Sequence, residues 1–378
     1  SRGLVGSEMC IRDSINIYKL KFRGPTVEEL GKSETRKLQQ TGGSTFIVSL
    51  PKPWVVQNGL GPKDQVKIEW RPNGSLRIIA EAASVRRRPE IDINLDDTAK
   101  PFLLEYLIGA YLSGAQLIRL RTKTHFEKEV RKTLRRFIQT TRGVEVISES
   151  EKTIELITML NPQDMPLLSS INRMYLLISS SMRDVSDALI RNEILDIEDA
   201  TEKEKEVDAL RLLLERQTGQ ILVSASMSNT FGTDRWEAAE LTNIVRSMER
   251  MGDHAYSIAC LASELPIPSD LDPEAMPLGA LPLWQSSFKL LMSNLRKLRI
   301  SEVQKTKGMI TTMIKKLDAY EEQIVRGVSD DVHAALFYDK LSEYTRRMLA
   351  YTSDMAESLI NIHAYRNNKE VILPDIMR

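Results

Sequence analysis

An apolar stripe between Leu241 and Ala259 constrains the fold more than any other feature of this sequence. Its members recur at the i, i+3, i+4, i+7 spacing of a helix that buries one face, and they are Leu241, Ile244, Val245, Met248, Met251, Ala255, Ile258 and Ala259. Gly252 interrupts the helix formers at a cost of about 1 kcal/mol relative to Ala, which indicates that another helix approaches closely there. The sequence therefore predicts a buried, tightly packed helix.

Two pairs of acidic residues accompany this stripe. Glu249 and Asp253 are four residues apart and flank it one turn from each other, and Glu204 and Asp208 have the same spacing in the preceding helical segment. On adjacent antiparallel helices the four carboxylates could converge, and their mutual repulsion would then favour a bound cation. The alternative is ordinary helix-surface charge, because basic residues lie close to both pairs.

The acidic pairs and the run from Glu249 to Ala255 resemble the PhoU family of phosphate-uptake regulators. That family is built from tandem three-helix bundles that carry E/D-x-x-x-D metal motifs. The resemblance covers residues 163–365 and implies metal ligands at Glu204, Asp208, Glu249 and Asp253. The chain has four histidines, and hard oxygen ligands fit divalent ions such as Mg²⁺, Ca²⁺ or Mn²⁺, or an iron cluster, better than they fit zinc.

The helical half of the chain indicates an internal repeat. Three helices are expected before a proline-rich break at 266–282 and three after it: Met165–Arg191, Ile197–Val223, Trp236–Leu261, Leu283–Arg299, Glu302–Val328 and Val332–Tyr365. A shift of 101 residues aligns Asp253 with Asp354. Two bundles, 163–264 and 280–366, that share one long seam would form an elongated all-α region.

The second repeat carries an incomplete copy of the acidic pattern. Ala350 stands where the first repeat has Glu249, so Asp354 lacks its upstream carboxylate. Asp318 and Glu322 supply a pair with the same spacing, but with the residue types reversed. We therefore expect the first bundle to hold the metal, and the second site, Asp318, Glu322 and Asp354, to be weakened or lost.

Residues 34–88 change to a period of two. Alternating runs at 46–50 and 66–70 predict strands, and Asn-Gly at 73–74 before a further alternating run is a strong hairpin signal. A short helix is expected at 51–58. The resulting β-β-α-β-β unit is too small to bury a core alone, so a second copy is expected to interleave with it.

This unit resembles the AbrB/SpoVT-like swapped-hairpin domain, a dimeric DNA-binding fold. The resemblance rests on Arg36-Lys37 before a glycine turn, on Leu50-Pro51-Lys52, and on the run 58–64. Ten basic and four acidic residues give 34–88 a net charge of +6, which attracts DNA phosphate.

The short helix departs from that family in one respect. Val55-Val56 stands where some AbrB-type domains carry an Arg-Arg pair. DNA contacts are therefore expected from Arg36, Lys37, Lys52 and Arg71. The alternative is that these charges only solubilise a dimerisation module.

Residues 89–161 predict a small α/β connector with the order β-α-β-α-β-β. Its second helix has a basic face that is either solvated or in contact with DNA or phosphate, and this face consists of Arg131, Lys132, Arg135 and Arg136. The same two alternatives hold for the arginine run 86–88. The sequence contains neither a phosphate-cradling glycine loop nor a nucleophile with a nearby base.

Composition adds limits for the whole chain. The 52 basic and 52 acidic residues cancel, which argues against a uniformly polyanion-binding protein. Cys10 and Cys260 cannot build a disulfide framework, so the cytoplasm is the expected setting. No apolar run approaches the roughly 18 residues that span a bilayer, so no stable membrane insertion is expected. Residues 1–33 are expected to be partly artefactual or disordered, and residues 367–378 to form a tail.

The predicted fold class is multidomain α+β: an N-terminal swapped-hairpin β domain, a small α/β connector, and C-terminal all-α PhoU-like tandem three-helix bundles. Resemblance to archaeal regulators with this fusion implies a homodimeric, DNA-binding transcriptional regulator of phosphate uptake, and not an enzyme. The alternative is a PhoU-type modulator that docks onto a phosphate transporter's ATPase, or onto a phosphate-sensing partner, and uses the hairpins only to dimerise. A carboxylate-bridged metal oxidase or hydrolase is weaker, because no Glu is followed three positions later by His.

Overall fold

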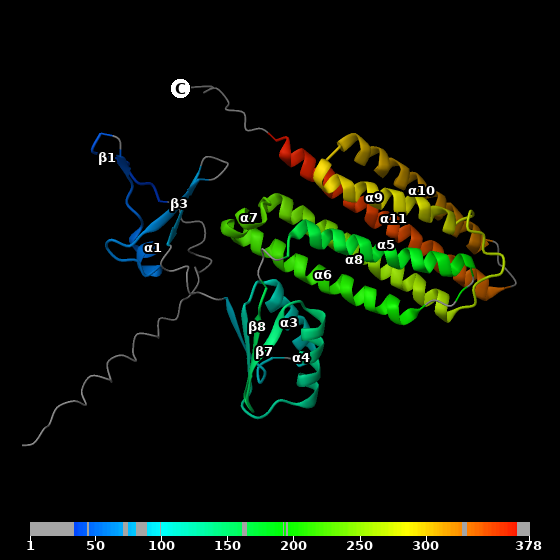
Figure 1. Cartoon of the computed structure of the whole chain (residues 1–378), viewed down its shortest axis with the longest axis horizontal. Helices are drawn as coiled ribbons and strands as arrows, with labels where there is room; N and C mark the ends of the chain where they lie inside the picture. The colour runs from blue at the N-terminus through cyan, green and yellow to red at the C-terminus, as the bar shows by residue number, and fades with distance from the viewer. Residues whose placement is uncertain are drawn as a thin grey trace, which may run out of the picture. The chain divides into compact units, whose positions relative to one another are not determined.

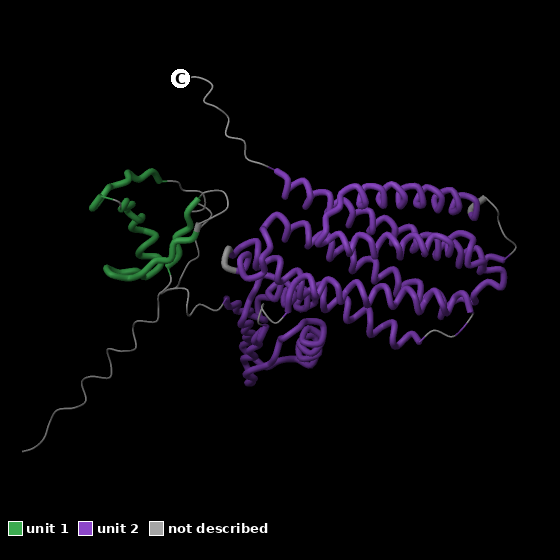
Figure 2. The backbone as a smooth tube through the Cα atoms, turned by 45° about the horizontal axis from the view of Figure 1, so that its top comes forward, with its two compact units in different colours: residues 1–87 green, residues 88–378 purple. Residues whose placement is uncertain are grey.

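The computed structural model describes residues 34–368, apart from residues 44, 71–74, 81–88, 99, 161–164, 192, 194–195 and 327–330. The chain divides into two compact units, residues 1–87 and residues 88–378 (Figure 2). The predictions for residues 1–33, for Arg71, for the arginine run 86–88 and for the tail beyond residue 368 lie outside the described residues. Within the described part, no helix is both long enough and apolar enough to cross a membrane.

The first unit has the predicted β-β-α-β-β order. Its elements are β1 (Gln39–Thr41), β2 (Thr45–Ile47), α1 (Lys52–Gln57), β3 (Val66–Trp70) and β4 (Leu76–Ala80). β1 pairs with β2, and β3 with β4, as two separate antiparallel hairpins. The helix α1 begins after Pro51, and Gly59 follows it at a φ of 63°, the left-handed conformation that ends helices and favours glycine.

The described residues of this unit do not form a hydrophobic core of their own. α1 contains no buried residue, β1 and β2 are exposed throughout, and Ala80 is the single buried apolar side chain. Phe46 and Val56 expose 64% and 67% of their surface. Apolar side chains in such numbers stay exposed only at a cost, and a second copy would cover them.

The second unit begins with the predicted α/β connector. Its elements are β5 (Glu90–Asn94), the 3₁₀ turn η1 (Lys100–Phe102), α3 (Leu103–Leu112), β6 (Leu117–Arg121), α4 (Lys128–Thr140), β7 (Val144–Glu149) and β8 (Thr153–Thr158). The four strands form one sheet in the order β5-β6-β8-β7. β5 and β6 are parallel, as a crossover through α3 requires, and the other pairs are antiparallel.

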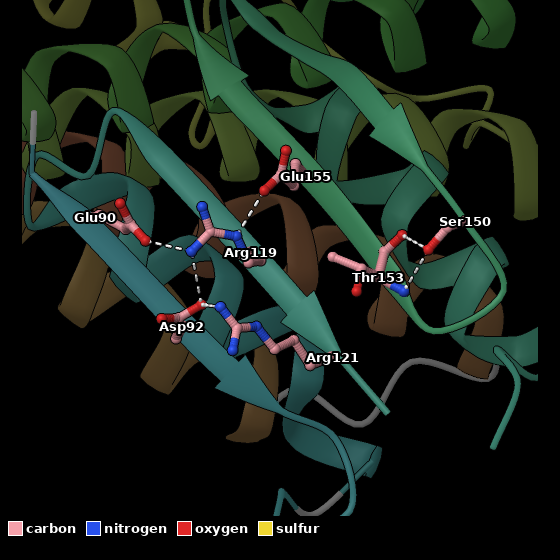
Figure 3. Close-up of polar contacts among 7 residues, drawn as sticks. All are labelled: Glu90, Asp92, Arg119, Arg121, Ser150, Thr153 and Glu155. Atoms are coloured by element: carbon pink, nitrogen blue, oxygen red, sulfur yellow. Dashed lines mark hydrogen bonds and ion pairs between the residues drawn. The ribbon is translucent and has the colours of Figure 1, made fainter. Parts of the chain in front are cut away.

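The two faces of this sheet differ in chemistry. α3 and α4 lie together on one face and share a hydrophobic core with it (Figure 1). On the other face Arg119 lies between three carboxylates (Figure 3). Its Nε donates a hydrogen bond to Glu155 at 2.6 Å, and its Nη1 donates to Glu90 and, at 3.3 Å, to Asp92. Asp92 also forms an ion pair with Arg121. Both arginines of this face are therefore paired with carboxylates of the same sheet.

The rest of the second unit is helical (Figure 1). Its elements are α5 (Leu167–Arg191), α6 (Ile197–Val223), α7 (Ala225–Phe231), α8 (Arg235–Glu264), the 3₁₀ turn η2 (Leu278–Ala280), α9 (Leu281–Lys297), α10 (Ile300–Arg326) and α11 (Val332–Arg366). The six long helices lie within three residues of their predicted bounds. The short helix α7 is not predicted by the sequence pattern, because two turns are too few for an apolar period to appear.

One hydrophobic core runs through both three-helix bundles, and the antiparallel helices α8 and α11 form its centre. Thr352 Oγ1 lies 3.2 Å from Met251 Sδ, and the Arg250 guanidinium lies 5.5 Å from the ring centre of Tyr351. In both contacts the partners are 101 residues apart, which is the shift that aligns the two repeats. Positions that the 101-residue shift makes equivalent therefore meet where α8 packs against α11.

A buried arginine joins the helical region to the α/β connector. Arg216 on α6 is 3% exposed, and its guanidinium donates to the carbonyl oxygens of Tyr111 and, at 3.2 Å, Gly114 at the end of α3. It also lies 4.8 Å from the ring centre of Tyr111. A cation at the C-terminal end of a helix is favourable for two reasons. It donates hydrogen bonds to carbonyl oxygens that have no partner within the helix, and it is attracted by the negative end of the helix dipole.

The absence of a core within the described hairpins predicts how this unit assembles. A fragment of residues 34–80 should sediment as a dimer, because the four short strands of one copy cannot bury their apolar side chains. Analytical ultracentrifugation across a concentration series measures this. Phe46→Ser should weaken the dimer, whereas Lys63→Ser, at an exposed polar position, should leave it intact. A folded monomer at all concentrations would rule out the interleaved hairpins.

Candidate functional site

A glycine allows α6 and α8 to pack closely beside the acidic pairs. Gly252 is buried, and a Cβ built at that position would lie 3.1 Å from Val207 Cγ1 and 3.6 Å from Ile178 Cγ1. The first distance is tighter than ordinary van der Waals contact, so a larger residue would push the two helices apart. The close approach that Gly252 predicts from the sequence is therefore present.

This packing brings three of the four predicted metal ligands together. Glu204 and Asp208 project from α6 and Asp253 from α8, and one carboxylate oxygen of each lies within 4.8 Å of the others. Glu204 and Asp208 are half-buried, and Asp253 is at the exposed side of the group. No other described residues form a group of three or more carboxylate, imidazole or thiolate ligands that could hold a metal ion.

The same arrangement makes these carboxylates hard to ionise. Burial, and next the repulsion from Asp208 and Glu204, raises the pKa of Asp253 to about 6. Burial also raises the pKa values of Glu204 and Asp208. Each group thus binds a proton more tightly than it would in water, and a cation that replaces the proton would relieve both the burial cost and the repulsion.

The fourth predicted ligand, Glu249, lies outside this group of three. Its Oε1 lies 3.0 Å from Nε of Arg211, a residue on α6. Burial, followed by repulsion from Asp253, still raises the pKa of Glu249 to about 7. Glu249 therefore forms an ion pair with an internal cation, whereas Glu204, Asp208 and Asp253 form no ion pair within the described part of the chain.

Arg211 is a residue beside the carboxylates that the sequence pattern did not single out. It follows Glu204 and Asp208 at i+7 and i+3 on α6, so helical spacing alone puts it on the same face. Its Nε is buried and makes no hydrogen bond in this arrangement, while its Nη1 lies 3.4 Å from Glu215, four residues along. Glu215 is held independently by Arg246 at 2.7 Å. Arg211 therefore lies between Glu249 and Glu215 and contacts both.

The donor set fits a hard cation. All of its atoms are carboxylate oxygens, the ligands preferred by Mg²⁺, Ca²⁺, Mn²⁺ and oxygen-ligated iron. His254 does not contribute, because its ring stacks between Tyr344 and Tyr351, at 5.6 Å from each ring centre. The residues present thus suit the type of metal that the sequence implies.

The acidic residues of the second repeat have basic neighbours. Asp318 lies 3.6 Å from Arg346 Nε, and the side chain of Asp318 is 54% exposed. Glu322 and Asp354 are exposed, and the cations Lys307 and Arg250 act on Asp354 to lower its pKa, although burial raises it overall. These three residues do not form a metal-ligand group within the described structure.

The predicted DNA-binding residues of the first unit are on its surface. Lys37 and Lys52 are exposed, and exposed Arg36 pairs with Glu34 two residues before it. Lys52 begins α1, and Arg36 and Lys37 precede β1. Arg71 lies outside the described residues.

The carboxylate group makes a direct prediction about metal content. Asp208→Asn with Asp253→Asn should remove bound metal from the purified protein, because two of the three converging ligands are neutralised. Asp318→Asn with Glu322→Gln is the matched control in the second repeat and should keep the wild-type content. Elemental analysis of both proteins checks this, and equal metal content in the two would refute the assignment to the first bundle.

The pairing of Arg211 with Glu249 predicts a competition. Arg211→Met should strengthen metal binding by about tenfold, since the metal no longer displaces an internal cation that is worth roughly 1–2 kcal/mol. Arg246→Met removes a neighbouring cation that pairs with Glu215 but not with Glu249, and should leave the affinity near wild type. Calorimetric titration of the three metal-free proteins with Mn²⁺ measures the difference. An affinity that falls in Arg211→Met would disprove the competition.

Comparison with protein families agrees with this division of the chain. A family model described as PhoU domain matches residues 171–262, which span most of the first bundle and all four predicted ligands. A second model, described as antidote-toxin recognition MazE, bacterial antitoxin, matches residues 39–87. No curated protein matches the chain. The chain is thus a fusion of a MazE/AbrB-type antitoxin-like domain with a PhoU domain.

Proposed function

We propose that this protein is a cytoplasmic, DNA-binding transcriptional regulator of phosphate uptake rather than an enzyme. The observation that carries the proposal is the presence, in one chain, of a MazE/AbrB-type domain and a PhoU domain. Both belong to regulatory families. In this proposal the first unit binds DNA as a homodimer, and the helical bundles bind a metal and receive the signal.

The charge of the first unit supports DNA as its ligand. Residues 34–88 have a net charge of +6, so a dimer would concentrate twice that charge on a small domain. Release of counterions from DNA phosphate by such a surface supplies most of the affinity of many DNA-binding proteins. We propose that Arg36, Lys37, Lys52 and Arg71 touch the DNA.

We propose that Glu204, Asp208 and Asp253 hold the metal, with Glu249 joining them when Arg211 releases it. The bound metal would supply a positive charge that neutralises the carboxylates and joins α6 to α8. In the second repeat Asp318, Glu322 and Asp354 would bind metal weakly or not at all. A phosphate transporter's ATPase, or another phosphate-sensing partner, is the proposed partner of the outer helix faces.

The helix α6 offers a route from the metal to the rest of the protein. It carries Glu204 and Asp208 in its first half and Arg216 two turns after Asp208. Because Arg216 is hydrogen-bonded to the end of α3, a shift of α6 would move the α/β connector as well. A coupling of 1–3 kcal/mol, typical of allosteric proteins, would change DNA affinity by about one to two orders of magnitude.

Charge reversal in the hairpin unit tests the proposed function. Arg36→Glu with Lys37→Glu should weaken binding to phosphate-transporter promoter DNA by about 3 kcal/mol, roughly a hundredfold, because each change removes an attraction and adds a repulsion. Fluorescence anisotropy titrations at increasing salt measure this. The slope of log affinity against log salt should also become shallower, by roughly 0.9 for each phosphate that the variant no longer neutralises.

A matched control separates a specific surface from total charge. Lys315→Glu with Lys316→Glu makes the same charge change on the exposed face of α10 and should bind like wild type. A protein that binds promoter and scrambled DNA equally, or that tolerates reversal of Arg36 and Lys37, would favour the alternative function. In that case the protein would be a modulator that docks onto the transporter's ATPase and uses the hairpins only to dimerise.

A further inference from the structure

The helix α4 has a concentrated positive surface in the domain that follows the hairpins. Its thirteen residues contain five basic side chains and one acidic side chain, Glu129. All five basic residues are exposed: Lys128, Arg131, Lys132, Arg135 and Arg136. At 100° per residue they fall within an arc of about 140°, opposite Val130, Leu134 and Phe137, which are buried against the sheet.

Most of these cations are not used inside the protein. Arg131 pairs with Glu149 on β7, but Lys128, Lys132, Arg135 and Arg136 form no ion pair within the described part of the chain. The opposite face of the same sheet differs, since Arg119 and Arg121 there are paired with Glu90, Asp92 and Glu155. Four like charges on three turns repel one another, and an external anion would relieve that repulsion.

The spacing of the charges fits an extended polyanion better than a small ion. The basic residues occur once per helical turn, so successive groups are about 5.4 Å apart along the helix axis. These groups are Lys128, the pair 131–132 and the pair 135–136. The stripe is convex and exposed, so it cannot enclose a single phosphate. It can lie along a DNA backbone, where charges recur every few ångströms and each neutralised phosphate releases counterions.

We propose that the basic face of α4 is a second DNA-binding surface, which binds the phosphate backbone without sequence preference. This inference rests on the proposed function, because it requires that the hairpins bring the protein to DNA. The inference gives the α/β connector a role of its own, because the connector would contact DNA in addition to the hairpins. Part of the DNA affinity would then lie in the domain that Arg216 joins to α6.

The test uses the full-length protein with Lys132→Glu and Arg136→Glu, an exposed i, i+4 pair. Affinity for promoter DNA should fall by about tenfold or more at low salt, and equally for scrambled DNA. The log–log salt slope should become shallower by roughly 2, because each of two side chains stops neutralising a phosphate at about 0.9 apiece. Lys132→Gln with Arg136→Gln should show a smaller effect, because it adds no repulsion. Lys315→Glu with Lys316→Glu is the control of equal charge change and should match wild type.

The outcomes separate this inference from the proposed function. A wild-type protein that does not prefer its promoter refutes both. Preserved promoter preference with no effect of the α4 reversal refutes the α4 surface alone. An equal effect of the α4 and α10 reversals would mean a net-charge effect, which also refutes it. The last experiment measures binding of the protein to vesicles that contain anionic lipid. If charge reversal on α4 abolishes vesicle binding but leaves DNA binding intact, α4 is a membrane-binding surface instead.

Discussion

Burial of the apolar stripe of α8 is the constraint on which the helical region depends. α8 packs against α5, α6 and α11, so its stripe is covered by both bundles at once. Met248 and Met251 are fully buried, and the burial of each contributes about 1.5–3 kcal/mol. This packing outweighs the repulsion among the carboxylates beside it. The acidic residues are therefore held together by the core, and not by attraction to one another.

The position of Gly252 then decides what the acidic residues can do. Because α6 packs against α8 at van der Waals distance through Val207, Asp253 comes within reach of Glu204 and Asp208. The next cation along α6, Arg211, takes Glu249. The site thus combines three carboxylates that form no ion pair within the described residues with a fourth that pairs with Arg211. In the function that we propose, a metal would have to compete with Arg211 for Glu249.

Local charge, rather than total charge, distinguishes the parts of this chain. The 52 basic and 52 acidic residues cancel, yet residues 34–88 have a net charge of +6, and α4 has five basic residues against one acidic residue. The balancing acids lie elsewhere, in the group on α6 and α8 and around Arg119 on the open face of the sheet. Such a separation agrees with our proposal that the hairpin unit binds DNA and that the bundles bind a cation.

Spacing along single segments was enough to predict the order of the elements, the six long helices, the hairpins, the close approach at Gly252 and the two acidic pairs. Each of these features except the approach at Gly252 depends on residues that are near one another in the chain, so their spacing carries the information. The approach at Gly252 involves different helices, but the glycine itself marks it in the sequence. Three contacts could not be predicted in this way: Glu249 faces Arg211, Thr352 meets Met251 across the seam, and Arg216 joins α6 to α3. Each of them joins different helices, and the choice among nearby partners depends on distances between helices that periodicity along one helix does not encode.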